Sequence, residues 1–397
     1  MNLRELGSIL LIAGTAIGAG MLALPMAAAP GGLFSAAILM IGICFLMTYA
    51  SLMILEVNLM LPADKNSFSS MAETLFGWPG KIVCWVCYSL LLYAIISAYI
   101  SGMGSLLSVL LEKGSVHLSP TTCSLLFTAL LGSTLLIGTL VVDRVNQVFL
   151  YMKGFFLFTA LFAMIPYVEA KTLFSFSTKA SFWYQAIPIF TTSFSCAMVI
   201  PSIVNYMGKE NYKSIRRVII IGSTIPLVVY IFWIFVVFGV LPQTGDVSFA
   251  VIQQNNNDLG MMIRFIQENI STRWIVGMID AFSNTAMTTS FLGVSLSLFD
   301  FLSDGFNIKK NKIGRLKTFF LTYIPPIIFA IFFPEGFMLA LRYSAIFVSI
   351  LLIIFPAALL WKKRRDHIKT DYRLPASPIA QVAVFATGVL FMICSFI

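Results

Sequence analysis

Gly14-Thr15-Ala16-Ile17-Gly18-Ala19-Gly20 places three glycines in seven positions, in the middle of the first long hydrophobic segment. Each glycine costs a helix about 1 kcal/mol relative to alanine, and in hydrocarbon every released backbone group needs another partner. We therefore expect the segment to unwind here. Unwound backbone at membrane depth is tolerated where it lines a cavity, and there free amides hold a carboxylate while free carbonyls hold a cation. The stretch predicts a small-molecule site.

The same glycines permit a second interpretation. Gly14 and Gly18 are four residues apart and would form a small face for close helix packing. The stretch alone leaves both interpretations open.

Composition assigns the class of protein. Of 397 residues, 59% are apolar and 11% are charged, and the mean hydropathy is +0.91. These values exclude a soluble globular domain and predict an all-α polytopic membrane protein. The first apolar run is too long for a cleaved signal peptide, so we expect it to remain as a span. The six cysteines lie in or beside apolar runs and predict neither a disulfide framework nor a metal site, and no cofactor is implied.

Hydrophobic runs of about 20 residues, the length that a bilayer requires, recur along the chain. We expect eleven transmembrane helices, at 7–29, 33–56, 82–110, 123–142, 147–168, 184–205, 217–240, 274–299, 317–334, 337–361 and 377–396. The long polar stretch 241–273 is predicted to be an external loop with one or two surface helices. The whole chain, 1–397, is then predicted to be a single transmembrane domain.

The distribution of positive charge predicts the orientation. With the N-terminus in the cytoplasm, the outer side receives six basic residues: Lys113, Lys171, Lys179, Arg264, Arg273 and Arg342. Apart from Lys153, which falls within a span, the other 19 of the 26 Lys and Arg lie on the cytoplasmic side. Eleven spans then place the C-terminus in the periplasm. The net charge of +9 is explained by short loops facing anionic lipid and needs no nucleic acid.

A second interrupted span suggests an internal repeat. The sixth segment carries Thr191-Thr192-Ser193-Phe194-Ser195-Cys196 at its middle and Pro201 beyond. Interrupted spans at positions one and six are expected of an inverted five-plus-five repeat, here 7–168 and 184–361, with an extra helix at 377–396. The alternative is that Ser and Thr bond back to their own helix. The recurrence favours a transporter.

Several stretches resemble one protein family. They are 14–25 (GTAIGAGMLALP), 93–94 (YA), 98–102 (AYISG), 201–204 (PSIV), 221–228 (IGSTIPLV), 289–293 (TSFLG) and 298–300 (LFD). Together they resemble the bacterial aromatic amino acid permeases, the tyrosine- and tryptophan-specific transporters of the amino acid/polyamine/organocation superfamily, and most closely the tyrosine-specific members. The resemblance implies the five-plus-five transporter fold with an eleventh helix, an inner-membrane location and proton-driven symport with alternating access, and it implies no enzymatic activity.

This sequence departs from the family pattern in the sixth span. Residues 193–198 read SFSCAM where tyrosine permeases carry Ser-Phe-Gly-Phe-His-Gly. Both histidines, His117 and His367, are predicted in loops, so no imidazole is available for proton relay in the membrane. In the eighth span Asn284 replaces an acid, with Asp280 one turn away. We therefore expect an aromatic amino acid as substrate, with tyrosine first and tryptophan or phenylalanine as alternatives.

The substrate site is expected at the two interruptions. The carboxylate is assigned to the backbone of Thr15, Ala16, Ile17, Gly18, Ala19 and Gly20. The ammonium is assigned to the backbone of Ser193, Phe194 and Ser195, and the aromatic ring to stacking on Tyr93, Tyr99 and Phe194. Since the chain has 13 Tyr and 36 Phe, packing or lipid contact is the alternative for each aromatic residue.

Lys153 lies about 9 Å into the fifth span. The alternative to a function is that its stem snorkels to the interface. The resemblance implies that this lysine takes the place of a cation, bounded by the carbonyls of Gly14, Ile17 and Ala286 and by the hydroxyls of Thr289 and Ser290. Its protonation would then couple transport to the proton gradient. Because these oxygens are all retained, sodium coupling stays open as the alternative.

Other charges near the membrane also need partners. We expect Glu56 to snorkel at the cytoplasmic end of span two. Glu335 is expected to pair with Arg342, with a gate as the alternative, and Asp280 to be a secondary proton site or a partner of Arg342. Two other classes of function compete. A membrane enzyme needs converging His, Cys or acids, and a channel needs a continuous polar lining, and the sequence shows neither.

Overall fold

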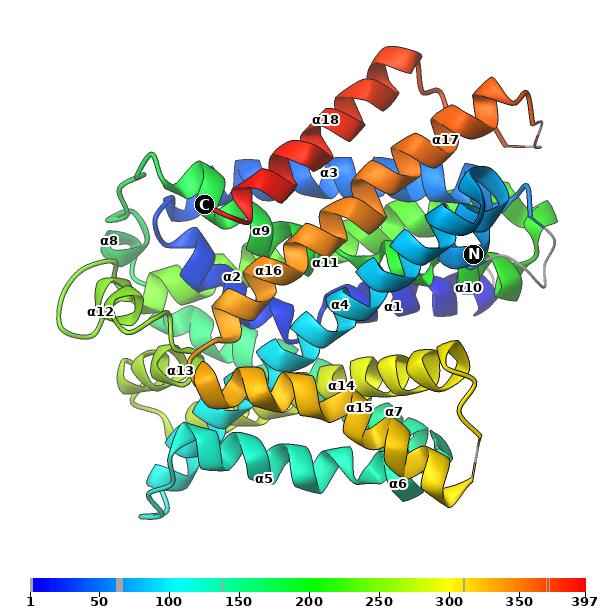
Figure 1. Cartoon of the computed structure of the whole chain (residues 1–397). Helices are drawn as coiled ribbons and strands as arrows, with labels where there is room; N and C mark the ends of the chain where they lie inside the picture. The colour runs from blue at the N-terminus through cyan, green and yellow to red at the C-terminus, as the bar shows by residue number, and fades with distance from the viewer. Residues whose placement is uncertain (1–2, 62–66, 138, 310, 369, 371) are drawn as a thin grey trace.

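Figure 1 shows the computed structural model of the chain, in which helices form one elongated bundle. The structure describes residues 3–61, 67–137, 139–309, 311–368, 370 and 372–397, and the side chains of 137–145 are not described. The predicted cytoplasmic charges of Lys65, Arg144, Lys310 and Lys369 lie outside this description. All regular secondary structure in the described residues is helical, which confirms the prediction of an all-α membrane protein.

The first half of the bundle contains eight helices. They are α1 (Leu3–Ala16), α2 (Gly20–Ala28), α3 (Gly32–Asn58), α4 (Phe68–Glu112), α5 (Pro120–Gly132), α6 (Thr134–Ile137), α7 (Thr139–Met164) and α8 (Ala170–Leu173). The second half contains α9 (Phe182–Ser193), α10 (Ile200–Met207), α11 (Tyr212–Val240), α12 (Phe249–Gln254), α13 (Leu259–Glu268), α14 (Arg273–Gly305), α15 (Lys312–Phe332), α16 (Phe337–Ser349), α17 (Phe355–Arg365) and α18 (Pro378–Cys394). A π-helical segment, Ile350–Ile354, joins α16 to α17.

Helix length and hydropathy support a polytopic arrangement. Within the described residues, eight helices are long and apolar enough to cross a bilayer, and the number is nine if the bent pair α1 and α2 is taken as one span. Two shorter apolar helices, Pro120–Leu136 and α18, lie where the fourth and eleventh spans are predicted. The count of eleven crossings stays a prediction. In Figure 1 the two ends of the chain lie at opposite ends of the bundle, as an odd number of crossings requires.

The first and sixth segments are both interrupted, as predicted. Between α1 and α2 the chain bends by 54°. In the sixth segment α9 ends at Ser193, a 3₁₀ turn η3 (Cys196–Val199) follows, and α10 begins at Ile200. The half-helix α2 packs against α9, and α1 packs against η3 and α11. The two interruptions therefore lie beside each other within the bundle.

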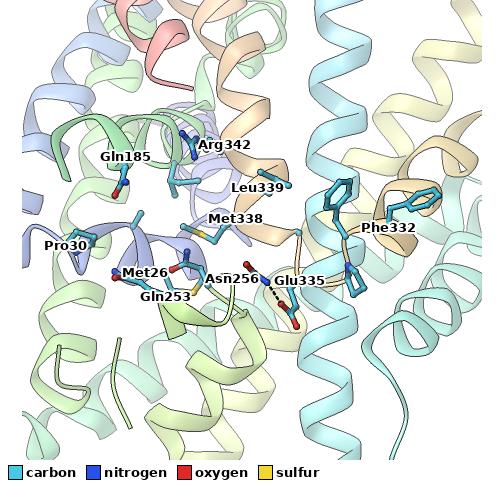
Figure 2. Close-up of a pocket in the computed structure, with 16 residues that line it drawn as sticks. Met26, Pro30, Gln185, Gln253, Asn256, Phe332, Glu335, Met338, Leu339 and Arg342 are labelled. Atoms are coloured by element: carbon cyan, nitrogen blue, oxygen red, sulfur yellow. Dashed lines mark hydrogen bonds between the residues drawn. The ribbon is translucent and has the colours of Figure 1, made fainter. Parts of the chain in front are cut away.

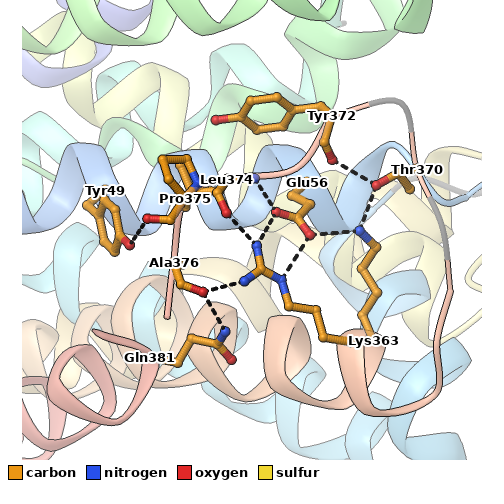
Figure 3. Close-up of polar contacts among 10 residues, drawn as sticks. Tyr49, Glu56, Lys363, Thr370, Tyr372, Leu374, Pro375, Ala376 and Gln381 are labelled. Carbon is orange, nitrogen blue, oxygen red and sulfur yellow. Dashed lines mark hydrogen bonds and ion pairs between the residues drawn. The ribbon is translucent and has the colours of Figure 1, made fainter. Parts of the chain in front are cut away.

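A buried ionic network connects the end of α3 with α17 and with the segment between α17 and α18 (Figure 3). Glu56, at the end of α3, is 1% exposed and accepts from Lys363 Nζ at 3.0 Å, from Arg364 Nη2 at 2.8 Å and from the Leu374 amide at 2.6 Å. Arg364 also donates to the carbonyls of Leu374 and Ala376. The expectation that Glu56 snorkels to the interface is therefore wrong, because its charge is compensated inside the protein.

The loop 241–273 contains two helices, α12 and α13. Asp258 caps α13 by accepting from the Met261 amide at 2.6 Å, and it accepts from Ser105 of α4 at 2.5 Å. Burial raises the pKa of this carboxyl above its usual range. The Ser105 hydroxyl in turn accepts from the Gly260 amide at 2.8 Å. These bonds fasten α13 to α4.

Two of the predicted pairings of outer charges are wrong. Asp280 forms an ion pair with Lys113 at 2.7 Å and accepts from Gln267 at 2.8 Å, instead of contacting Arg342. Glu335 accepts from Asn256 of the external loop at 2.8 Å. Both partners lie far away in the sequence, and chain order did not reveal them.

Candidate functional site

One hydroxyl group bridges the two interruptions. The Tyr230 hydroxyl of α11 lies 2.5 Å from the Ala16 carbonyl and 2.9 Å from the Ser193 carbonyl, the last carbonyls of α1 and α9. Its side chain is fully buried. Helices end with unpaired carbonyls that need a donor when they are buried. Tyr230 offers its single hydroxyl proton to the two carbonyls together, so it links the ends of both half-helices.

The first interruption keeps free backbone donors. The Ala19 amide donates to Ser290 Oγ of α14 at 3.0 Å. The amides of Gly18 and Gly20 have no hydrogen-bond partner within the described part of the chain. They lie at the N-terminus of α2, where the helix dipole favours an anion. The arrangement is chemically suited to bind a carboxylate.

The second interruption lies against the first. Ser193 Oγ donates to its own helix at Ile189 O, 2.8 Å away, and lies 3.3 Å from the Gly20 carbonyl. Phe194 is 1% exposed, and its ring meets the Tyr230 ring edge-on at a centroid distance of 5.1 Å. Ser195 is half-buried. Ser193 therefore satisfies its own helix and also contacts the first interruption.

Tyr99 is another predicted aromatic near this region. It is 8% exposed on α4, and its side chain lies close to Ser290, the residue that accepts from the Ala19 amide. A predicted aromatic side chain is therefore a neighbour of the polar partner of the unwound backbone.

Two other predicted site residues have different partners. The Tyr93 hydroxyl donates to the Leu321 carbonyl of α15 at 2.8 Å. The Thr15 side chain is exposed and donates to Leu11 of its own helix at 2.7 Å. The structure does not bring these two side-chain hydroxyls to the interruptions, because each satisfies a backbone carbonyl elsewhere.

Lys153 is buried at the end of α1. Its side chain is 5% exposed, and Nζ donates to the Ile17 carbonyl at 2.7 Å and to the Gly14 carbonyl at 3.5 Å. The C-terminal end of a helix carries partial negative charge, which an ammonium group compensates. Snorkelling to the interface is excluded by this burial. Of the other predicted ion-coupling residues, Thr289 donates back to the Ala286 carbonyl at 3.1 Å.

A cavity of about 780 Å³ lies farther along the same helices, on the side of the external loop (Figure 2). Met26 of α2 lines it, about 9 Å along the helix from Gly20. Gln185 of α9 and Gln253 of α12 line it as well. Arg342 of α16 lines it too, and the Nε and Nη2 atoms of this residue are buried and have no partner among the described residues. The cavity has room for an amino acid, and its lining includes a cationic residue.

Sequence reasoning missed Tyr230. The residue lies in an apolar span, 217–240, one turn after Pro226. A tyrosine hydroxyl in such a run needs a partner when it is buried, which is the signal that could have identified it.

We predict that Tyr230→Phe lowers both the thermal stability and the uptake rate. The change removes the one hydroxyl donor that the two buried carbonyls share, which costs about 1–3 kcal/mol. Tyr343→Phe is the matched control, because that side chain is 44% exposed. Thermal unfolding in detergent, with uptake into proteoliposomes, measures both effects. Unchanged values for Tyr230→Phe would show that the bridge has no role.

Comparison with known proteins finds relatives that match almost the whole chain. The chain is 34% identical to the tyrosine-specific transport system 2 of Haemophilus influenzae, over 99% of this chain and 96% of that protein. It is 34% identical to the tyrosine-specific transport system 1 of the same organism, over 98% and 95%. It is 29% identical to the low affinity tryptophan permease of Escherichia coli (strain K12), over 98% and 94%.

The family match covers the chain from end to end. Residues 1–395 match the tryptophan/tyrosine permease family, including both interrupted segments, Lys153 and Tyr230. The chain therefore belongs to the tryptophan/tyrosine permease family.

Proposed function

We propose that this protein is a secondary active transporter that imports an aromatic amino acid, tyrosine first, by proton symport with alternating access. The observation that carries the proposal is that the Gly18 and Gly20 amides have no partner in the described residues, beside the second interruption, while Lys153 donates to carbonyls at the end of α1. Two relatives named as tyrosine-specific, at 34% identity, favour tyrosine over tryptophan.

The substrate is proposed to bind through both of its charges. Its carboxylate binds the backbone of residues 16–20, where the Gly18 and Gly20 amides have no partner in the described residues, and its ammonium donates to carbonyls at Ser193 to Ser195. The Ser193 carbonyl also accepts from Tyr230. Backbone dipoles then contact both charged groups of the zwitterionic substrate. Phe194 and Tyr99 supply aromatic surface for the ring. Tyr93 stays a candidate through its ring alone, since its hydroxyl is bonded to α15.

Coupling is assigned to Lys153. As an ammonium it stabilises the carbonyl end of α1, and loss of its proton would remove that attraction and free α1 to move. A proton entering from one side and leaving to the other would then accompany each substrate. With His117 and His367 both in loops, this lysine is the proposed proton carrier in the membrane.

Sodium symport is the second candidate. The carbonyls of Gly14, Ile17 and Ala286 and the hydroxyls of Thr289 and Ser290 are oxygen ligands of the type that Na⁺ accepts. Several of them have other partners, however. Lys153 donates to Ile17, Thr289 donates to Ala286, and Ser290 accepts from Ala19. The proton therefore ranks first.

Alternating access would begin at the outer cavity. Arg342, with two unpaired nitrogens, would attract the carboxylate, and the external loop would close over it. Reorientation of the half-helices α1 and α10 would then open the opposite side.

Uptake into proteoliposomes tests the proposal. Labelled tyrosine, tryptophan and phenylalanine are offered with pH and sodium gradients imposed separately. We expect saturable tyrosine uptake that the pH gradient drives and sodium does not change. A strict sodium requirement would instead support the second candidate, and unitary currents would indicate a channel.

The proposed location is the bacterial inner membrane, with the N-terminus in the cytoplasm and the C-terminus in the periplasm. The charge distribution of the loops supports this orientation. We expect a reporter fused at the C-terminus to lie outside the cytoplasm and one inserted at 307–313 to lie inside. Alkaline phosphatase and fluorescent-protein fusions measure this, and the opposite pattern would reverse the topology.

A further inference from the structure

A second cavity, of about 710 Å³, lies at the start of α11. Figure 1 places this end of α11 beside α10, at the end of the bundle opposite α12. The outer cavity is lined by Gln253 of α12. The lining combines the first turns of α11 with the segment between α17 and α18. It contains Tyr212, Lys213, Arg216, Arg217, Ile220, Tyr372 and Arg373. The cavity is therefore strongly basic.

The charge in this lining is poorly compensated. Arg217 pairs with Glu5 at 3.3 Å. Within the described residues, no carboxylate forms an ion pair with Lys213, Arg216 or Arg373. Cations that share one small space repel one another, so an anion placed among them is attracted by all of them. The cavity also adjoins the N-terminus of a 29-residue helix, where the backbone dipole adds to that attraction.

The surroundings distinguish between a free anion and a lipid. Arg217, Ile221 and Val228 lie on one face of α11, at positions four and eleven residues apart. Ile221 is 44% exposed and Val228 is 62% exposed, and Ile220, at 39%, lines the cavity itself. Since α11 has the length and hydropathy of a membrane span, this apolar strip faces hydrocarbon. The basic cavity thus opens directly onto the level of the headgroups.

We propose that this cavity binds the phosphate headgroup of an anionic phospholipid, with an acyl chain lying along the exposed strip of α11. Lys213, Arg216 and Arg373 would contact the phosphodiester, and Ile221 and Val228 the chain. Basic residues at this level attract anionic lipid. The proposal needs only that the chain spans a membrane, so it is independent of the transported substrate and of the coupling ion.

The test is a titration of the detergent-purified full chain with phosphatidylglycerol, read by native mass spectrometry. We expect Arg216→Gln combined with Arg373→Gln to weaken lipid binding about tenfold or more, since two charges are lost at the headgroup. The matched control is Lys312→Gln combined with Lys317→Gln, which removes two exposed charges at the start of α15. The control is expected to bind as the wild type does. Arg216→Lys with Arg373→Lys keeps both charges and should retain most of the binding.

Further arms identify the source of the phosphate. Phosphatidylcholine, inorganic phosphate and glycerol 3-phosphate are expected to bind far more weakly than phosphatidylglycerol. Binding of inorganic phosphate as tight as that of phosphatidylglycerol would overturn the lipid assignment. Unchanged phosphatidylglycerol binding by the double Gln variant would overturn the site. Tyrosine uptake by the same preparation reports on transport separately, so failure of one proposal is distinguishable from failure of the other.

Discussion

Gly18→Leu is expected to abolish uptake while the protein remains inserted. A Cβ atom at this position would lie 2.8 Å from Ser290 Oγ, closer than such contacts occur, and Ser290 is the acceptor for the Ala19 amide. A leucine would displace that acceptor and also cover the free amides proposed to bind the substrate carboxylate. We expect a loss of about 100-fold or more, as is typical when a bound group is displaced from its productive geometry.

A matched variant separates this effect from a general loss of folding. Gly42→Leu makes the same change on α3, where an added Cβ meets nothing within 4 Å and the residue is exposed. This control is expected to transport normally. Labelled tyrosine uptake, normalised to the inserted protein, measures both variants. Near-normal uptake with an unchanged KM in Gly18→Leu would refute the assignment of the first interruption to the substrate.

Lys153→Gln is expected to lose accumulation driven by the pH gradient. Glutamine can still donate to the Ile17 carbonyl, but it carries no proton that can be exchanged. Counterflow, which needs no driving ion, should persist at a reduced rate. Lys171→Gln removes an exposed lysine between α7 and α9 and serves as the control. The measurement is the steady-state ratio of internal to external tyrosine under an imposed pH gradient.

Two related outcomes complete this test. Wild-type uptake is expected to be indifferent to sodium, and Thr289→Ala should impair transport without changing its ion dependence. Full accumulation by Lys153→Gln would show that protons are carried elsewhere. A shift to sodium dependence in that variant would instead reveal that the oxygen ligands around the lysine can accept a metal cation.

The sequence predicted the two interruptions of the backbone better than the contacts of the side chains near them. The interruption after Ala16 follows from three glycines that no helix favours, and the one after Ser193 from adjacent Ser and Thr residues. Both are local properties, so they could be predicted from a few neighbouring residues. The carbonyls of Gly14 and Ile17 as neighbours of Lys153 came from the resemblance, and the structure has hydrogen bonds to both.

Pairings over long sequence distances escaped prediction. Tyr230 bridges residues 37 and 214 positions away, and Asp280 pairs with Lys113 across 167. Composition and periodicity carry no information about which of many buried groups meet. A family motif does not predict a side-chain contact either. Tyr93 lies in a stretch that resembles the family, yet its hydroxyl donates to a backbone carbonyl of α15.

The buried network around Glu56 has a consequence for the order of events during synthesis. Glu56 leaves the ribosome 307 residues before Lys363 and 318 residues before Leu374. Until then α3 carries a carboxyl whose permanent partners do not yet exist, and an unpaired charge is costly to bury. The N-terminal half must therefore keep this end of α3 hydrated while the remaining helices insert. A chain that ends before Lys363 would keep the Glu56 carboxyl exposed and unpaired. This exposed charge would distinguish an incomplete chain from the complete protein.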